Sequence, residues 1–329
     1  MLARIVCALT AVLLTAACTD APGSKSTEST ENTGSTESTG SARSTASPGS
    51  TRISCTIKPG EHTLRHAGQS RRYLLALPAK GRGPWPIVLN LHGLGSNAAR
   101  QAVRSRLPQL GPARGYAVVT PQVAPHRMAW TLPGYYGPDD TGYLTRILDT
   151  LVAKGCAVKG QQFAAGMSYG GGMSTALVCG MNGRLAAVAP VAGFNVVPPC
   201  EEARPTTIIA FHGTGDQTVP YRGGHPFARS GSRLRTLARL VTLPAVESTA
   251  REWAAIMGCG AAVTSRVTSG VRLRAWQGCR EEASVRLYTI SGAGHVWPRP
   301  GSGRGIDAAE LILNAFDAVR KARAGRRGG

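Results

Sequence analysis

Residues 162–180 read QFAAGMSYGGGMSTALVCG, and this stretch decides how the chain folds. Its first six residues form a short, mostly apolar run of the kind that builds a buried parallel strand. Residues 169–179 are typical of a helix despite their glycines. Between the two, Gly166-Met167-Ser168-Tyr169-Gly170 matches the pattern Gly-x-Ser-x-Gly, a sharp turn that lifts a serine hydroxyl above the edge of a sheet. The stretch therefore predicts a strand, a tight turn carrying Ser168, and a helix.

Strands and helices alternate on both sides of this turn. We expect further strands at residues 71–78, 87–91, 116–122, 185–192, 207–211 and 285–290, and further helices at 139–154 and 307–320. This alternation predicts an α/β fold with a mostly parallel central sheet and helices on both faces. Because no internal repeat or second unit is visible, we expect a single domain over residues 52–320.

Two further residues with catalytic chemistry follow later strands. Asp216 lies in HGTGDQTVPY after the strand at 207–211, and His295 lies in SGAGHVWPRP after the strand at 285–290. A serine hydroxyl becomes a good nucleophile when an imidazole takes its proton, and a carboxylate holds that imidazole in place. The order Ser168, Asp216, His295 is that of the α/β-hydrolases, so the residues predict acyl transfer to water.

Other residues compete for the same roles. His212 shares a strand end with Asp216, so we expect it to be structural, and His225 follows Asp216 by nine residues with no strand between them. Asp216 is the only Asp between Ser168 and His295, although a turn-capping role would also fit its Gly-rich surroundings. These positions favour His295 as the base and Asp216 as the acid.

The reaction also needs hydrogen-bond donors for the negative charge that develops on the carbonyl oxygen. We expect the backbone N–H of Tyr169, directly after the nucleophile, to supply one and that of Leu94 to supply the other. Leu94 lies in a Gly-rich loop after an early strand, and His92 in the same loop is expected to brace it. The sequence has no Cys-x-x-Cys or clustered His and Cys, so we expect neither a metal site nor a cofactor.

Four motifs together resemble the esterases grouped with polyhydroxybutyrate depolymerases and feruloyl esterases. They are LHGLGSN (91–97), GMSYGGGM (166–173), HGTGDQTVPY (212–221) and GAGHVWP (292–298). The resemblance spans roughly residues 55–318 and implies Ser168 as nucleophile, Asp216 as acid and His295 as base. It also implies the disulfides Cys179–Cys200 and Cys259–Cys279, with Cys55–Cys156 as the remaining pair.

Aromatic and acidic residues near these motifs suggest how the site is shaped. Trp130 and the pair Asp139-Asp140 resemble a segment of the same family, and we expect them to form the site entrance and an adjoining helix. Trp130 and Trp297 are candidates for the substrate pocket, because their rings could face an acyl group or a sugar. Packing roles would explain both tryptophans equally well.

The N-terminus indicates export. Residues 1–17 have a basic start and an apolar run too short to span a bilayer, which predicts a signal peptide. The segment Leu14–Cys18 resembles a lipobox with Thr15 in the usual aliphatic position, so we expect Cys18 to be lipidated; an ordinary cleaved signal is the alternative. Residues 18–51 then form a Ser/Thr-rich tether without large apolar side chains, which we expect to be disordered. These features predict a lipid-anchored protein at the cell surface.

Cysteines and charge agree with an exported chain. Six of the eight cysteines lie beyond Cys18, and an even number in an exported protein indicates disulfides, although fifteen pairings are open. The net charge is +20, with five basic residues in each of 222–239 and 320–327. Such clusters could bind an acidic surface polymer or simply be solvated, and residues 321–329 are expected to form a disordered tail. No nucleic-acid motif is present, so nucleic acid is not an expected partner.

The sequence thus favours an exported, monomeric serine esterase that acts on feruloyl, acetyl or hydroxybutyrate esters. Two alternatives remain at this point. A serine peptidase of the prolyl-oligopeptidase kind shares the order of the three residues, and a non-catalytic surface lipoprotein could retain the same fold.

Overall fold

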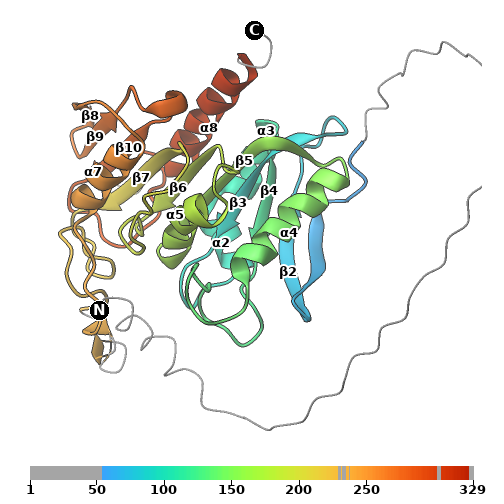
Figure 1. Cartoon of the computed structure of the whole chain (residues 1–329), viewed down its shortest axis with the longest axis horizontal. Helices are drawn as coiled ribbons and strands as arrows, with labels where there is room; N and C mark the ends of the chain where they lie inside the picture. The colour runs from blue at the N-terminus through green and yellow to red at the C-terminus, as the bar shows by residue number, and fades with distance from the viewer. Residues whose placement is uncertain (1–53, 229–230, 232–234, 237, 302–304, 326–329) are drawn as a thin grey trace, which may run out of the picture.

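The computed structural model describes residues 54–228, 231, 235–236, 238–301 and 305–325. The expected signal peptide, Cys18, the tether and the end of the basic tail lie outside these ranges. Figure 1 shows the described residues as one sheet with helices packed against it.

Ten strands form the sheet in the order β1-β2-β4-β3-β5-β6-β7-β10-β9-β8. Their bounds are β1 (Gly60–His66), β2 (Gln69–Ala76), β3 (Trp85–Leu91), β4 (Ala117–Pro121), β5 (Ala157–Met167), β6 (Ala187–Val191), β7 (Thr207–Gly213), β8 (Ala262–Thr268), β9 (Val271–Trp276) and β10 (Val285–Ile290). The six strands from β4 to β10 in this order are parallel to one another, and antiparallel strands flank them on both sides. The expected α/β-hydrolase fold with a mostly parallel sheet is confirmed.

Helices cover both faces of the sheet, and its central strands are therefore buried on both sides. They are α2 (Ala98–Ser105), α3 (Leu107–Ala113), α4 (Asp140–Ala153), α5 (Tyr169–Gly180), α7 (Val246–Ile256) and α8 (Ala308–Gly325). Alternate residues of β3 point to opposite faces: Leu89 packs in a core that includes side chains of α4, α5 and α7, whereas Val88 packs in a core that includes side chains of α3 and α8. Every residue of β6 and β7 is buried.

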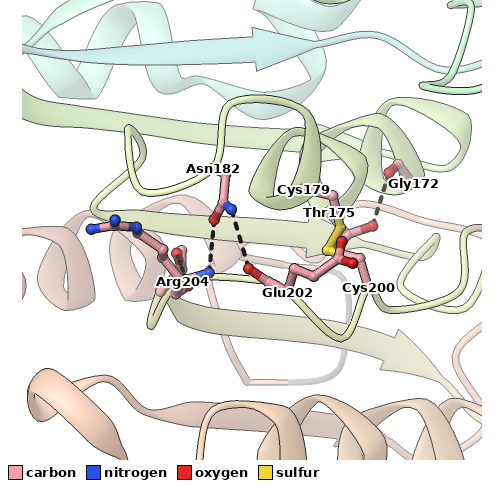
Figure 2. The surroundings of a disulfide bond; sticks show 8 residues. Gly172, Thr175, Cys179, Asn182, Cys200, Glu202 and Arg204 are labelled. Carbon is pink, nitrogen blue, oxygen red and sulfur yellow. Dashed lines mark hydrogen bonds between the residues drawn. A yellow bond between two sulfur atoms is a disulfide. The ribbon is translucent and has the colours of Figure 1, made fainter.

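Three disulfides lie in the described residues, and they are the pairs that the resemblance implied: Cys55–Cys156, Cys179–Cys200 and Cys259–Cys279. Figure 2 shows Cys179–Cys200, which joins the end of α5 to the segment between β6 and β7. Asn182 holds the same segment through hydrogen bonds with the Glu202 carbonyl and the Arg204 amide. The helix that follows Ser168 is therefore fixed at its far end.

None of the helices in the described ranges combines the length and the apolar composition needed to cross a bilayer.

Candidate active site

Ser168 lies in the turn between β5 and α5, in a strained backbone conformation. Its φ of 56° and ψ of −125° are unusual for a residue with a side chain and cost about 1–3 kcal/mol. The turn closes tightly because its flanking residues are glycines. A Cβ atom at Gly166 would lie 2.1 Å from the Gly170 carbonyl oxygen, and one at Gly170 would lie 2.3 Å from the Leu91 carbonyl oxygen. Only glycine at both positions allows Ser168 to stand at the sheet edge.

Asp216 and His295 form a hydrogen-bonded pair. The loop after β7 carries Asp216 and the loop after β10 carries His295, and His295 Nδ1 lies 2.7 Å from Asp216 Oδ2. The other carboxylate oxygen accepts hydrogen bonds from the amides of Thr218 and Val219, each at 2.9 Å. The Asp216 side chain is fully buried, whereas the His295 side chain is 20% exposed. A proton on Nδ1 leaves Nε2 of His295 free to accept one.

The surroundings of Asp216 keep its carboxyl group ionised. Burial acts to raise the pKa of Asp216, but the hydrogen bonds from His212 and His295 and from the Val219 amide outweigh it and hold the pKa well below the ordinary value of 3.8. His212 is buried on β7, with Nε2 donating to the Val219 carbonyl at 2.8 Å and lying 3.4 Å from Asp216 Oδ2. His212 therefore supports the Asp216 loop.

Ser168 shares the sheet edge with this pair. β5, β6, β7 and β10 are neighbouring parallel strands, so the loops that follow β5, β7 and β10 leave the sheet on the same side. Within the described part of the chain, the Ser168 hydroxyl makes no hydrogen bond, to His295 or to any other group. Catalytic hydrogen bonds are often longer without substrate, so this arrangement is compatible with proton transfer between the two residues.

Two backbone N–H groups beside Ser168 have no acceptor among the described residues. One belongs to Tyr169, the first residue of α5, and the other to Leu94. The Leu94 loop lies against the serine, since a Cβ atom at Gly93 would be 3.7 Å from Ser168 Oγ. The neighbouring Gly95 amide is occupied by the Met128 carbonyl at 2.8 Å. Leu94 and Tyr169 are therefore among the residues beside Ser168 whose amides have no acceptor in the described part of the chain.

His92 and Trp130 support this loop from beneath. The Val123 amide donates to His92 Nε2 at 3.3 Å, so the His92 proton lies on Nδ1 and is donated to the Gly93 carbonyl at 2.9 Å. Burial lowers the pKa of His92, which favours the neutral ring. The Trp130 indole donates to the His92 carbonyl at 2.8 Å and is only 2% exposed. Of the two roles that the sequence left open for Trp130, its burial under the loop favours packing over contact with the substrate.

Asp139 and Asp140 fix the segment that carries Trp130. Asp139 caps α4 by accepting from the Gly142 amide at 2.7 Å. Asp140 forms a buried ion pair with Arg71 and accepts from the Thr131 amide at 2.6 Å. Burial raises the pKa of Asp140 in spite of the Arg71 charge. The two acids therefore anchor the helix and the chain leading into it.

Trp297 is 4% exposed and forms part of the wall of a cavity of about 700 Å³ beside His295. Gly193, which was not singled out from the sequence, packs against Ser168: a Cβ atom there would lie 1.9 Å from the Ser168 carbonyl oxygen. The available signal was a glycine two residues after β6, the buried strand that neighbours β5. No group of three or more His, Cys, Asp or Glu in the described ranges is placed to hold a metal ion.

Known proteins resemble the chain in sequence, although no protein-family model matches it. Feruloyl esterase B of Piromyces equi is 28% identical over 219 residues, which cover 64% of this chain and 39% of that protein. The bifunctional acetylxylan esterase/xylanase XynS20E of Neocallimastix patriciarum is 25% identical over 166 residues, covering 50% of this chain and 24% of that protein. A probable feruloyl esterase C of Aspergillus terreus is 28% identical, covering 47% of this chain and 58% of its own. The chain thus spans less than two thirds of the length of each of these relatives.

Among solved structures, the acetyl xylan esterase from Aspergillus awamori superposes with a TM-score of 0.56 at 14% identity, covering 78% of this chain and 99% of that protein. A likeness at this identity concerns the fold alone. The chain therefore has the α/β-hydrolase fold, and the resemblance to feruloyl esterase-like α/β-hydrolases that its motifs indicated is confirmed.

Proposed function

We propose that the protein is a serine esterase in which Ser168, His295 and Asp216 act as a catalytic triad and the Leu94 and Tyr169 amides bind the oxyanion. The observation that carries the proposal is the buried, ionised Asp216 bonded to His295 at the sheet edge where Ser168 stands. Two unpaired amides next to the serine support the same role. The reaction is the hydrolysis of a carboxylic ester through an acyl-enzyme.

In the first half of the reaction, Ser168 Oγ attacks the carbonyl carbon while its proton passes to His295 Nε2. The carbonyl oxygen becomes an oxyanion that accepts hydrogen bonds from the two free amides. Asp216 remains ionised and stabilises the imidazolium. When the bond to the leaving oxygen breaks, His295 gives its proton to the departing alcohol and the acyl group remains on Ser168.

In the second half, water attacks the acyl-enzyme. His295 takes a proton from the water, and the resulting intermediate collapses with release of the acid. The same proton then returns to Ser168 Oγ, so the enzyme is restored and one water is consumed for each ester bond. No other co-reactant is required for this balance.

Feruloyl and acetyl esters of polysaccharides are the proposed substrates, with hydroxybutyrate oligoesters as a second class. The names of the relatives support the first class, since they include feruloyl esterases and an acetylxylan esterase. The motifs quoted from the sequence support the second. We propose that the protein acts on both classes as a monomer, on a soluble ester or at the end of a polymer.

The proposal is tested with the purified protein on 4-nitrophenyl acetate, methyl ferulate, acetylated xylan and hydroxybutyrate oligomers. We expect kcat for His295→Ala to fall by about three orders of magnitude or more, because the nucleophile loses its base. His225→Ala is the matched control, since His225 is exposed and, among the described residues, bonds only the Val241 carbonyl. Equal activity of the two histidine variants, or an active Ser168→Ala, would reject the triad.

We also propose that the protein is exported and anchored by a lipid on Cys18, with the acidic surface polymer as a secondary partner of its basic clusters. Three disulfides support an oxidising location. The N-terminal mass of the protein isolated from membranes tests the anchor. A diacylglyceryl-modified Cys18 is expected, and an unmodified N-terminus at another residue would contradict it.

A further inference from the structure

The cavity beside His295 has basic residues in its wall. Its volume is about 700 Å³, and two arginines, Arg104 and Arg299, line it together with Met167 and His295. None of the described residues that line it is acidic. Because none of these wall residues is acidic, the positive charge of Arg104 makes the hollow attractive to an anion.

Arg104 is the key residue because its guanidinium lacks a strong acceptor. It lies in the last turn of α2, half-buried, and its only hydrogen bond in the described residues goes to the Met167 sulfur at 3.4 Å. A thioether is a weak acceptor. Arg106, two residues later, instead pairs with Asp307 at 2.7 Å. The fork of donors on Arg104 matches a carboxylate, which it would bind through two parallel hydrogen bonds.

The position of the cavity indicates which part of an ester it would receive. His295 must reach the leaving oxygen to protonate it, so the alcohol portion of the substrate lies on the His295 side of the site. The cavity wall includes His295 and the two residues after it, Val296 and Trp297. Val296 is 46% exposed, so the wall offers apolar surface to the body of the alcohol.

We propose that this cavity is a subsite for a carboxylate carried on the alcohol portion of the ester, with Arg104 as its binding residue. The inference rests on the proposed esterase function and narrows its substrate class to acidic alcohols. Two sources share this chemistry: the free end of a hydroxy-acid oligoester, and a uronic acid within an acylated polysaccharide. Arg104 determines specificity and takes no part in bond breaking.

The test compares substrates that differ only in this charge. One pair is the linear 3-hydroxybutyrate dimer and the same dimer with its carboxyl group capped as the methylamide. The other pair is an acetylated methyl glucuronoside and the acetylated methyl glucoside with the acetyl group at the same position. We expect kcat/KM to be about tenfold higher for the acidic member of at least one pair, since a hydrogen bond to a charged group is typically worth this much. Whichever pair shows the preference identifies the source.

Arg104→Gln should abolish the preference, because it should lower kcat/KM for the acidic members much more than for the neutral members. Arg100→Gln is the matched control, because it removes the same charge from an exposed position one turn earlier on α2, outside the cavity wall. It should keep the preference. High salt should reduce the preference of the wild type, as expected for an ionic contact.

Equal rates for acidic and neutral members in the wild type would overturn the subsite and leave the proposed esterase intact. An equal loss on both members in Arg104→Gln would also overturn it, because Arg104 would then be structural. If the wild type hydrolyses neither pair nor 4-nitrophenyl acetate, the proposed function itself fails.

Discussion

At the scale of single residues, Asp216 shows how burial and hydrogen bonding compete. Removing a carboxylate from water favours its neutral form, but here three donors bond it, namely His295 and the amides of Thr218 and Val219. His212 Nε2 lies a further 3.4 Å from Oδ2. The hydrogen bonds prevail, and the pKa stays below its ordinary value. Asp216 thus remains charged and can orient His295.

Asp216→Asn should lower kcat by about three to four orders of magnitude, because the amide cannot stabilise the imidazolium and favours the wrong tautomer. It should also alter stability in a pH-dependent way. The pKa of Asp216 is lower in the folded chain than in the unfolded chain, so its carboxylate stabilises the fold above pH 3.8 and this contribution is lost as the pH falls toward the lowered pKa.

Denaturant unfolding of the wild type and Asp216→Asn at a series of pH values measures this contribution. The difference in unfolding free energy between the two proteins should be largest at neutral pH and should shrink as the pH falls below 3.8. A difference that stays constant down to pH 2 would show that Asp216 is not held ionised by its neighbours.

At the scale of elements, the strands and helices whose buried apolar residues recur at regular spacing could be predicted from the sequence. Strands β2 to β7 and β10, and helices α4, α5 and α8, all correspond to predicted segments with ends shifted by a few residues. Strands β1, β8 and β9 and helices α2, α3 and α7 were not predicted. β8 is exposed at every residue but its last, so no alternation marks it, and pairing with β9 alone makes it a strand. α3 contains Gly111 and Pro112, two residues with low helix propensity, so its sequence does not predict a helix. Leu107 of this helix is buried, and that burial depends on the rest of the fold.

The helix α7 is a different case. Val246, Ala250, Trp253 and Ala254 are buried at helical spacing, so the pattern was present in the sequence.

The contacts of the site could be predicted less well than its members. Ser168, Asp216, His295, Leu94 and Tyr169 were chosen from local motifs. The burial of Trp130 and the weak partner of Arg104 depend on residues far away in the chain, which a local pattern does not contain.

The disulfide Cys179–Cys200 should stabilise α5, the helix that follows Ser168. It closes a loop of 21 residues, so replacing both cysteines by alanine should lower the unfolding free energy by about 3 kcal/mol in the chain-entropy account. Denaturant midpoints measure the loss. Cys259–Cys279 closes a loop of 20 residues and serves as the matched control.

Similar losses for the two double variants would agree with loop closure as the main effect. A much larger loss for the first pair would place the effect in the packing of α5. No loss for either pair would contradict a stabilising role for these bonds.

At the scale of the whole molecule, the sheet order explains why residues 127 positions apart in the sequence can act together. Parallel strands β5, β6, β7 and β10 end at one edge, and the loops that leave this edge carry Ser168, Asp216 and His295. The antiparallel strands at both margins of the sheet add no residue to the proposed triad. Cys55–Cys156 joins the segment before β1 to the residue before β5, and Cys259–Cys279 joins the segment after α7 to the segment between β9 and β10.

The central claim is that His295 activates Ser168, and covalent labelling with a serine-directed fluorophosphonate tests it most directly. Mass spectrometry of the intact protein and of its peptides should find one adduct, on Ser168, that forms about a thousandfold more slowly in His295→Ala. Labelling at another residue, no labelling of the wild type, or an unchanged rate in His295→Ala would contradict the account.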